Sequence, residues 1–271
     1  MAERRGATEP KGPVGDLSDA LAELPQRLHH VQQCIAAAAA QAGRAVNEIC
    51  LVAVSKRQPL AAVCAAYDAG VRHFGESTAQ ELQTKACGLK DSGRTEAQWH
   101  FIGRLQRNKV RAVLQFAQVI HSLDRLALLP LFAQQRAAVA AAQQQILVQV
   151  NIGMEPQKSG VLPSELAALV AAWQAPLPQE LARAPLVGLM AVPPRAGDPE
   201  AYFANLLALR DGLQRDGLVA PGQLRHLSMG MSDDYQRAIA CGATMVRVGS
   251  ALFGARPAPA TRPPNLSGGT L

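Results

Sequence analysis

Eight short runs of apolar and β-branched residues recur along the sequence, and helical patterns fill the gaps between them. Several runs are apolar at consecutive positions, as expected for strands covered on both faces. The runs lie at residues 49–54, 71–75, 99–103, 119–123, 146–152, 186–192, 225–230 and 245–249. The helical patterns lie at about residues 60–69, 77–88, 107–117, 124–142, 163–174, 199–216 and 233–241. Eight strands separated by seven helices predict an α/β fold, a single (β/α)8 TIM-type barrel.

The rest of the chain fits one barrel with an extra N-terminal helix. That helix is predicted over residues 16–42, where apolar residues recur at three- and four-residue steps. A length of 271 residues would allow two smaller domains, but no composition break lies within residues 16–256. We therefore predict one domain over residues 16–256, between a disordered N-terminal extension (1–15) and a disordered Pro/Gly-rich tail (257–271). A doubly wound open sheet is the alternative, but no G-x-G-x-x-G turn follows the first strand.

The composition is typical of a reduced, cytoplasmic protein. The five cysteines form no C-x-x-C pair and have no histidine at metal spacing, which predicts free thiols and no metal site. The first fifteen residues lack the apolar segment of a signal peptide, and no stretch is long enough to span a membrane. The net charge of +6 comes mostly from scattered arginines, and few aromatic residues are present to stack on bases. We expect no binding to membranes or nucleic acid, although the charge suits a small anionic ligand.

The C-terminal ends of the strands are where TIM-type barrels place their chemistry. After the first strand, Ser55 and Lys56 interrupt the apolar run, and Pro59 can begin the next helix. A lysine at this position projects into the barrel mouth, where loss of water makes its amine nucleophilic toward an aldehyde. The alternative is a lysine that only extends along the rim to reach water. This segment alone does not distinguish the two.

The last two strands end in segments suited to a phosphate. In such barrels a phosphate is held by the loops after strands seven and eight and by the N-terminus of a short extra helix, where backbone N–H groups lack partners. The candidate residues are Ser228, Gly230, Ser232, Gly249 and Ser250. Alternatively, Ser232 caps a helix that begins at Asp233.

Arg247 is predicted to point into the barrel. It shares its strand parity with Met245 and Gly249, so all three residues face the same side. A buried arginine is costly without an anionic or acceptor partner. A pyridine nitrogen or a phosphate would supply that partner, and so would a buried carboxylate.

Polar residues at three other strands have structural explanations. Ser77, with Gln80 three residues later, predicts a capping box after strand two. His100 within strand three is expected to be a hydrogen-bonded core group rather than a catalyst. Ser122 or Asp124 is expected to cap the helix after strand four.

Together these segments resemble the pyridoxal phosphate homeostasis protein family, the YggS/PROSC family. The matching segments are LVAVSK (51–56), HFGESTAQE (73–81), WHFIGRLQRNK (99–109), EPQKSG (155–160), GLMAVPP (188–194), LSMGMSDDYQRAI (227–239) and MVRVGSALFGAR (245–256). The resemblance covers residues 16–256, and the last two segments are its most specific part.

The resemblance implies a monomeric fold-type III barrel, similar to the N-terminal domain of alanine racemases, that binds pyridoxal 5′-phosphate (PLP). It implies that Lys56 forms a Schiff base with PLP and that Arg247 contacts the pyridine nitrogen. The implied phosphate contacts are Ser228, Gly230, Ser232, Gly249 and Ser250, and the residues implied to lie near the pocket are Asn151 and His226. Family members often carry asparagine where this chain has Ser77, so the chain departs from the pattern there.

Two functions of different classes remain: a PLP-dependent racemase or decarboxylase of amino acids, and a non-catalytic protein that buffers or delivers PLP. A racemase of this fold type takes a second base from an additional β domain, for which no room is expected after strand eight. The three tyrosines, Tyr67, Tyr202 and Tyr235, all fall on predicted helices. An arginine at the pyridine nitrogen would also leave the ring a poorer electron sink. We therefore expect a PLP homeostasis protein without a catalytic site, whose partners are PLP and the apo-forms of PLP enzymes. A barrel that binds another phosphorylated ligand without a Schiff base is a third hypothesis.

Overall fold

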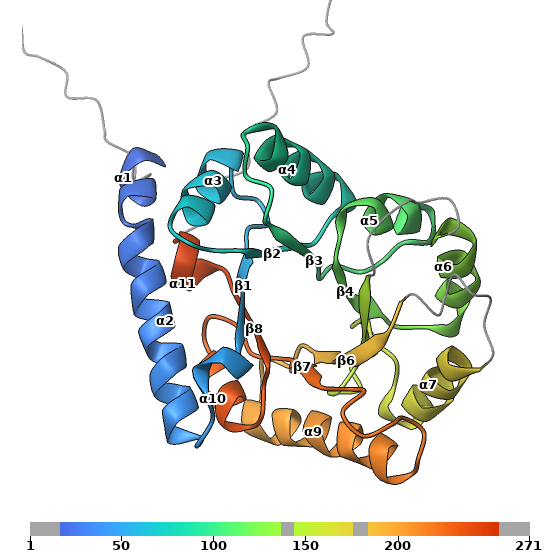
Figure 1. The fold of residues 1–271 in the computed structure, drawn as a ribbon. Helices are drawn as coiled ribbons and strands as arrows, with labels where there is room; N and C mark the ends of the chain where they lie inside the picture. The colour runs from blue at the N-terminus through green and yellow to red at the C-terminus, as the bar shows by residue number, and fades with distance from the viewer. Residues whose placement is uncertain (1–16, 137–143, 176–183, 255–271) are drawn as a thin grey trace, which may run out of the picture.

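Eight parallel strands form a closed barrel, in which each strand pairs with the next along the chain and β8 pairs with β1 (Figure 1). The computed structural model describes residues 17–136, 144–175 and 184–254, so both predicted terminal extensions lie outside the described residues. The strands are β1 (Cys50–Val54), β2 (His73–Glu76), β3 (Gln98–Phe101), β4 (Val119–Leu123), β5 (Gln145–Val150), β6 (Leu186–Ala191), β7 (His226–Ser228) and β8 (Met245–Val248). The predicted (β/α)8 barrel is confirmed.

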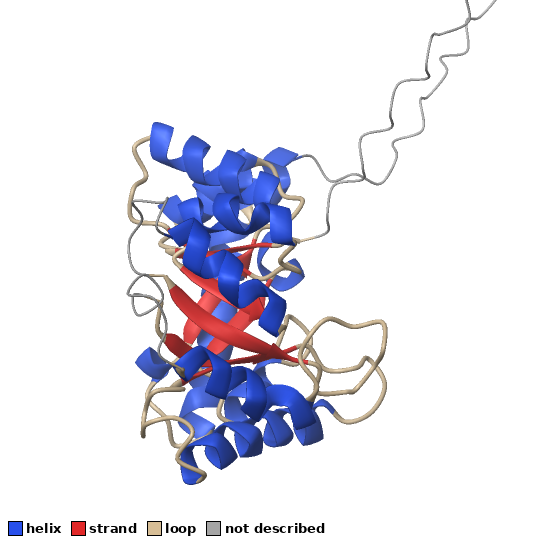
Figure 2. Ribbon diagram, turned by 90° about the vertical axis from the view of Figure 1, so that its right-hand side faces the viewer, coloured by secondary structure: helices blue, strands red, loops and turns tan. Residues whose placement is uncertain are grey.

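Helices surround the barrel as an outer layer, with the strands at the centre (Figures 1 and 2). They are α3 (Leu60–Asp68), α4 (Ala79–Asp91), α5 (Val110–Phe116), α6 (Leu129–Arg136), α7 (Leu166–Gln174), α9 (Pro199–Arg215), α10 (Tyr235–Ala240) and α11 (Ser250–Phe253). The short 3₁₀ turns are η1 (Val46–Glu48), η2 (Arg107–Lys109), η3 (Leu126–Leu128) and η4 (Pro163–Glu165). The last three precede α5, α6 and α7, so these helices begin later than predicted. None of the helices in the described ranges is long and apolar enough to cross a membrane.

The predicted N-terminal helix is interrupted near its start. α1 (Leu17–Ala22) and α2 (Leu24–Gln41) flank Glu23, and Pro25 lies in the first turn of α2. Proline has no N–H to donate to the carbonyl four residues earlier, so the hydrogen-bond ladder cannot continue across this point. In Figure 1, α2 lies beside α10 and α11, which it contacts, next to the strands that close the barrel.

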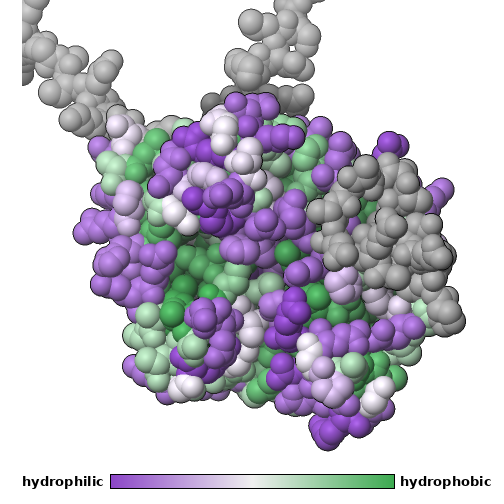
Figure 3. All heavy atoms as spheres, in the orientation of Figure 1, coloured by the Kyte–Doolittle hydropathy of each residue, from purple (hydrophilic) through white to green (hydrophobic). Residues whose placement is uncertain are grey.

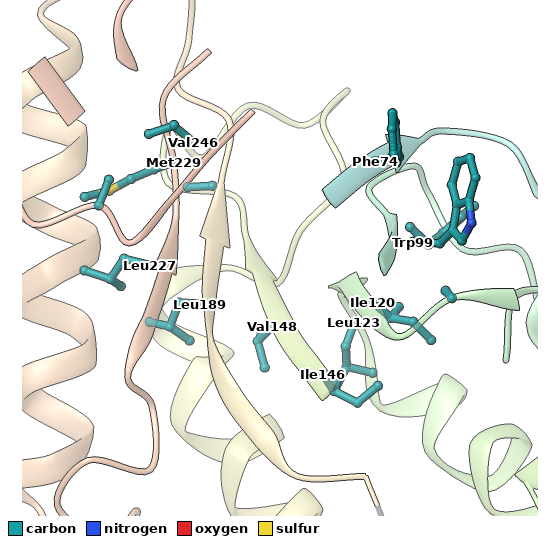
Figure 4. Packing of buried hydrophobic residues seen from close by; sticks show 14 of the residues in the cluster. Phe74, Trp99, Ile120, Leu123, Ile146, Val148, Leu189, Leu227, Met229 and Val246 are labelled. Atoms are coloured by element: carbon teal, nitrogen blue, oxygen red, sulfur yellow. The ribbon is translucent and has the colours of Figure 1, made fainter. Parts of the chain in front are cut away.

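Outward-facing side chains of the strands form the main hydrophobic core with the helices (Figure 4). Successive side chains of a strand point to opposite faces, so these apolar residues alternate with residues that face the barrel interior. The outward-facing residues include Phe74, Trp99, Ile120, Ile146, Val148, Leu189, Leu227 and Val246. Each is at most 4% exposed, and removal of this apolar surface from water stabilises the helix layer on the barrel.

The barrel interior is partly apolar and partly polar. A small separate apolar cluster consists of Val119, Leu147, Val187, Met190 and Met245. The buried polar residues that accompany it are His100, His121, Ser228 and Arg247. Bulky branched side chains usually fill such an interior, so a polar centre requires an explanation beyond packing.

Candidate functional site

Lys56 lies two residues beyond the end of β1, in the turn that leads to α3, and it is half-buried. Both of its neighbours in the chain are anchored. Ser55 Oγ donates to Glu76 Oε1 at 2.7 Å, and the Arg57 N–H donates to Glu81 Oε2 at 2.8 Å. Arg57 has a φ of +63°, in the left-handed region that residues other than glycine seldom adopt. The turn that carries Lys56 is therefore held in one conformation from both sides.

A buried ion-pair network lies beneath this turn. Lys85 Nζ donates to Glu76 Oε1 at 2.7 Å, to Glu81 Oε2 at 3.0 Å and to Ser55 O at 2.6 Å. Glu76 is fully buried, and burial raises the pKa of its carboxyl to about 7 despite the opposing charge of Lys85. Glu76 Oε2 is buried without a hydrogen-bond partner among the described residues. The network connects the ends of β1 and β2 to α4.

The helix after β2 begins one residue later than the predicted capping box requires. Thr78 is the N-cap of α4, and its Oγ1 accepts the Glu81 N–H at 3.2 Å. The Ser77 carbonyl packs against Gly103 instead, where a Cβ would lie 1.8 Å from Ser77 O. The predicted box of Ser77 and Gln80 is wrong, because the chain first passes over Gly103 before it turns into the helix.

Neither Ser122, which lies within β4, nor Asp124, which follows it, caps the next helix in the described part of the chain. The N-cap of η3 is Arg125, and no side chain caps that turn. Asp124 forms an ion pair with Arg125, and Ser122 Oγ is buried without a hydrogen-bond partner in the described part of the chain. The cap predicted at Ser122 or Asp124 is therefore wrong.

The end of β8 lies beside the end of β1, because the two strands are adjacent and parallel. Gly249 is the N-cap of α11, the short extra helix that the sequence predicts. A Cβ at Gly249 would lie 3.3 Å from Val54 O, so glycine allows the segments that follow β8 and β1 to approach each other closely. The turn at Gly249 and Ser250 thus follows the strand next to the one that leads to Lys56.

Ser232 connects the loops after β7 and β8. Its Oγ accepts the N–H groups of Gly249 at 3.2 Å and Ala251 at 3.3 Å. α10 begins only after Asp234, whose Oδ1 accepts the Met231 N–H at 2.6 Å. The alternative interpretation of Ser232 as a helix cap is therefore wrong.

Gly230 shapes the same loop. Its φ is +88°, and a Cβ there would lie 2.6 Å from Ala238 Cβ and 2.9 Å from Tyr235 Cα. Both the left-handed backbone and the close packing of α10 require glycine at this position.

Arg247 is buried inside the barrel and is bound by neutral oxygens. Its Nη1 donates to Ser228 O and to Ser228 Oγ, each at 2.7 Å, and its Nη2 donates to Ala191 O at 2.9 Å. Burial lowers the pKa of Arg247 to about 10, so the guanidinium stays charged at neutral pH. Within the described ranges no carboxylate forms an ion pair with Arg247, and Asp234 favours its charge only from a longer distance. The arginine is thus a buried cation suited to an acceptor or an anion.

A chain of buried hydrogen bonds leads from Ser228 across the barrel. Ser228 Oγ lies 2.9 Å from His121 Nδ1, and His121 Nε2 lies 2.9 Å from His100 Nδ1. His100 Nε2 in turn lies 2.9 Å from His73 Nδ1. Burial lowers the pKa of His100 to about 3 and that of His121 well below its ordinary value, so both rings are neutral near pH 7. The expectation that His100 is a hydrogen-bonded core group is confirmed.

Asn151 follows β5 at the C-terminal ends of the strands, whereas His226 begins β7 at their N-terminal ends. Asn151 Nδ2 donates to Glu155 O at 2.8 Å, and Asn151 Oδ1 accepts the Glu155 N–H at 3.2 Å, so the amide shapes the loop after β5. His226 is the first residue of β7 and lines a pocket with Cys50 and His73 at the N-terminal ends of the strands. The implied place of His226 near the cofactor is wrong, because it lies at the opposite end of the barrel from Lys56.

Comparison with known proteins establishes the family. Residues 27–257 match the model of the alanine racemase N-terminal domain family. A pyridoxal phosphate homeostasis protein of Aquifex aeolicus is 42% identical over 234 residues, which are 85% of this chain and 97% of the relative. The chain belongs to the pyridoxal phosphate homeostasis protein family. The Escherichia coli (strain K12) member is 40% identical over 241 residues, which are 86% of this chain and 97% of that relative.

Solved structures agree with this membership. PipY of Synechococcus elongatus PCC7942, solved with PLP bound, has a TM-score of 0.71 and 33% identity and covers 85% of this chain and 100% of its own. Alanine racemase of Corynebacterium glutamicum has a TM-score of 0.57 at 19% identity and covers 90% of this chain and 63% of its own, which shows the shared barrel fold. The predicted resemblance to the homeostasis family and to the racemase barrel is confirmed.

The groups that position Lys56 in this homeostasis-family barrel were not predicted from the sequence. Glu81 and Lys85 are four residues apart on one helix, a spacing that signals a surface ion pair. Their connection to Glu76 and Ser55 depends on how α4 folds back over the ends of β1 and β2. No local pattern in the sequence reports that contact.

Proposed function

We propose that this chain binds PLP through a Schiff base on Lys56 Nζ and buffers or delivers the cofactor in PLP homeostasis. The observation that carries the proposal is the position of Lys56 at the end of β1, beside the turn at Gly249 and Ser250 that follows β8. Relatives named pyridoxal phosphate homeostasis proteins and the PLP-bound PipY support the same function.

The residues present suit a phosphorylated pyridine aldehyde. We assign the phosphate to the backbone of Gly249 and Ser250 and to Ser232, whose Oγ already contacts that segment. Gly230 leaves room for the loop that brings Ser232 there. Backbone N–H groups at a helix start favour an anion because they point outward without intrahelical partners.

Arg247 would bind the pyridine nitrogen of PLP. Ser228 and the Ala191 carbonyl hold its guanidinium in place, so Ser228 acts on PLP through Arg247. Asn151 likewise acts indirectly, because its amide shapes the loop after β5. When bound, PLP supplies an aldehyde and an electron-withdrawing ring.

The same residues favour a carrier over an enzyme. Arg247 is charged and only donates hydrogen bonds, so a pyridine nitrogen beside it stays unprotonated and the ring withdraws electrons less strongly. A racemase also needs a second base, commonly a tyrosine. The three tyrosines of this chain lie on α3, α9 and α10, in the outer layer of helices.

We further propose that the protein acts as a cytoplasmic monomer whose protein partners are the apo-forms of PLP enzymes. All five cysteines are free thiols, as expected in a reducing compartment. Delivery to an apo-enzyme requires release of PLP, which a Schiff base allows because water reverses it.

The lysine is tested by spectroscopy and peptide mapping. PLP added to the native chain should produce a visible absorption band, and borohydride reduction should attach the cofactor to the peptide containing Lys56. Lys56→Ala should abolish both signals, whereas Lys90→Ala, an exposed lysine on α4, should leave them unchanged. Attachment at another lysine, or an unchanged band in Lys56→Ala, would show the assignment to be wrong.

Carrier and enzyme are separated by turnover. The PLP-loaded protein, incubated with each proteinogenic amino acid, should release no carbon dioxide and form no opposite enantiomer at a sustained rate. Sustained turnover of any amino acid would establish the racemase or decarboxylase alternative. The loaded protein should also restore activity to an apo-enzyme. The activity restored by free PLP at the same total concentration serves as the comparison.

A further inference from the structure

Three potential metal ligands meet inside the barrel at the end opposite to Lys56. Cys50 begins β1, His73 begins β2 and His100 lies in β3. One ligand atom of each, the thiol sulfur or a ring nitrogen, lies within 4.8 Å of those of the other two. We propose that Cys50, His73 and His100 bind a divalent transition-metal ion of the Zn²⁺ class.

The chemistry of the three donors selects the kind of ion. One sulfur and two imidazole nitrogens suit Zn²⁺ or Co²⁺, whereas Mg²⁺ and Ca²⁺ require oxygen ligands. His73 Nδ1 and His100 Nε2 are 2.9 Å apart. A tetrahedral ion with bonds of about 2.0 Å needs about 3.3 Å between two nitrogens, so the rings have to separate by only a few tenths of an ångström.

The cluster can be reached from outside. A pocket of about 390 Å³ lies over the N-terminal ends of the strands, and Cys50, His73, His226 and Thr244 are among its lining residues. Figure 3 shows hydrophobic residues in a hollow beside α2 and over β1, within a largely hydrophilic surface. Three protein ligands and an open side leave a fourth position for water or another small ligand, as in metal sites that exchange ligands.

The hydrogen-bond chain supplies the support that a metal-bound histidine needs. With the ion on His100 Nε2, His100 carries its proton on Nδ1 and donates it to His121 Nε2 at the observed 2.9 Å. His121 then donates from Nδ1 to Ser228 Oγ, also at 2.9 Å. Such outer partners fix the tautomer and the orientation of a metal-binding ring.

Binding of the ion releases one proton in total, from the Cys50 thiol. His73 and His100 would bind the ion as neutral imidazoles, each through one ring nitrogen. The proton between His73 Nδ1 and His100 Nε2 moves to the other nitrogen of the ring that carries it. Zn²⁺ binds the Cys50 side chain as its thiolate, so binding of the ion displaces the thiol proton, which leaves to solvent.

The binding test uses the full-length chain without a histidine tag, in equilibrium dialysis against ZnCl₂ with metal counted by elemental analysis. We expect one tightly bound ion per chain. Cys50→Ser and His73→Phe should each weaken binding by about 10-fold or more. Cys64→Ser, a half-buried cysteine on α3, and His29→Gln, an exposed histidine on α2, are the matched controls and should bind as the native chain does.

Cobalt reports the ligands directly. Co²⁺ bound to the Lys56→Ala chain, which lacks the absorption of attached PLP, should show thiolate-to-cobalt charge transfer and tetrahedral d–d bands, both absent from the double variant with Cys50→Ser. Zinc should also raise the melting temperature of the native chain and not that of Cys50→Ser.

Failure of this site is distinct from failure of the proposed function, because metal binding is also measured in the Lys56→Ala chain, which cannot form the Schiff base. Absence of a stoichiometric ion, or binding that Cys50→Ser and His73→Phe leave unchanged while both variants stay folded by circular dichroism, would overturn the proposal. Equal weakening by the two control substitutions would do the same, since it would show adventitious surface binding.

Discussion

Lys85 and Glu76 form an ion pair of 2.7 Å in the interior, where their side chains are only 7% and 0% exposed. A buried pair seldom stabilises a protein more than well-packed apolar residues would, because both charges lose their water. Lys85 also donates to the carbonyl of Ser55, the residue before Lys56. We infer that the pair is present to position the turn that carries Lys56.

Glu76→Ala should lower the free energy of unfolding by about 3–5 kcal/mol, because it leaves the Lys85 ammonium buried with less compensation. Urea denaturation measures the change. Glu200→Ala breaks an exposed ion pair with Arg237 and should cost no more than about 1 kcal/mol. A loss as small for Glu76→Ala as for this control would contradict the positioning role.

Glu76 should also produce a pH dependence of stability. Burial raises its pKa from the ordinary 4.5 to about 7, so the folded state binds this proton more tightly than the unfolded state. The stability from this proton is fully present below pH 4.5 and is lost as the pH rises to about 7, by on the order of 3 kcal/mol.

Glu76→Gln removes the titrating group and keeps its size. The difference in unfolding free energy between the native chain and Glu76→Gln should therefore change across this pH range, and in favour of the variant as the pH rises. A difference that stays constant from acidic to neutral pH would show that the carboxyl does not titrate there.

Arg247→Lys should weaken PLP binding by about tenfold or more although the charge is retained. A lysine cannot donate to the Ser228 and Ala191 oxygens and to a ligand with the planar geometry of arginine, and each lost charge-assisted bond costs about 1.5–3 kcal/mol. Titration of the visible band with PLP measures the affinity. Arg111→Lys on the exposed face of α5 serves as the control, and equal affinities in all three proteins would remove Arg247 from the site.

Gly230→Ala should destabilise the fold by about 3 kcal/mol, because a Cβ meets Ala238 at 2.6 Å and the φ of +88° disfavours alanine. The loss should be accompanied by weaker PLP binding, since the same loop presents Ser232. Gly212→Ala on α9 has its nearest neighbour 3.9 Å away and should instead stabilise the helix by about 0.5–1 kcal/mol. Thermal unfolding of the two variants distinguishes the outcomes.

The barrel and its strand ends could be predicted from the sequence because both depend on local patterns. Apolar runs of five to seven residues indicate burial on two faces, and the residue that follows each run marks a strand end. Strand parity likewise places Arg247 inside the barrel, and glycines mark the turn after β8. The helix caps were less predictable, since whether Ser77 or Thr78 begins α4 depends on how closely the chain passes Gly103.

Which residues the side chains at the strand ends contact was decided only by the tertiary structure. Closure of β1 against β8 brings Lys56 near Gly249, and the fold of α4 brings Lys85 to Glu76 and Ser55. The same closure puts Cys50, His73 and His100 within reach of one ion, although they lie in three separate strands. Local spacing determines the direction in which a side chain leaves its strand, but contacts between distant segments depend on barrel closure and register, which no short stretch of sequence encodes.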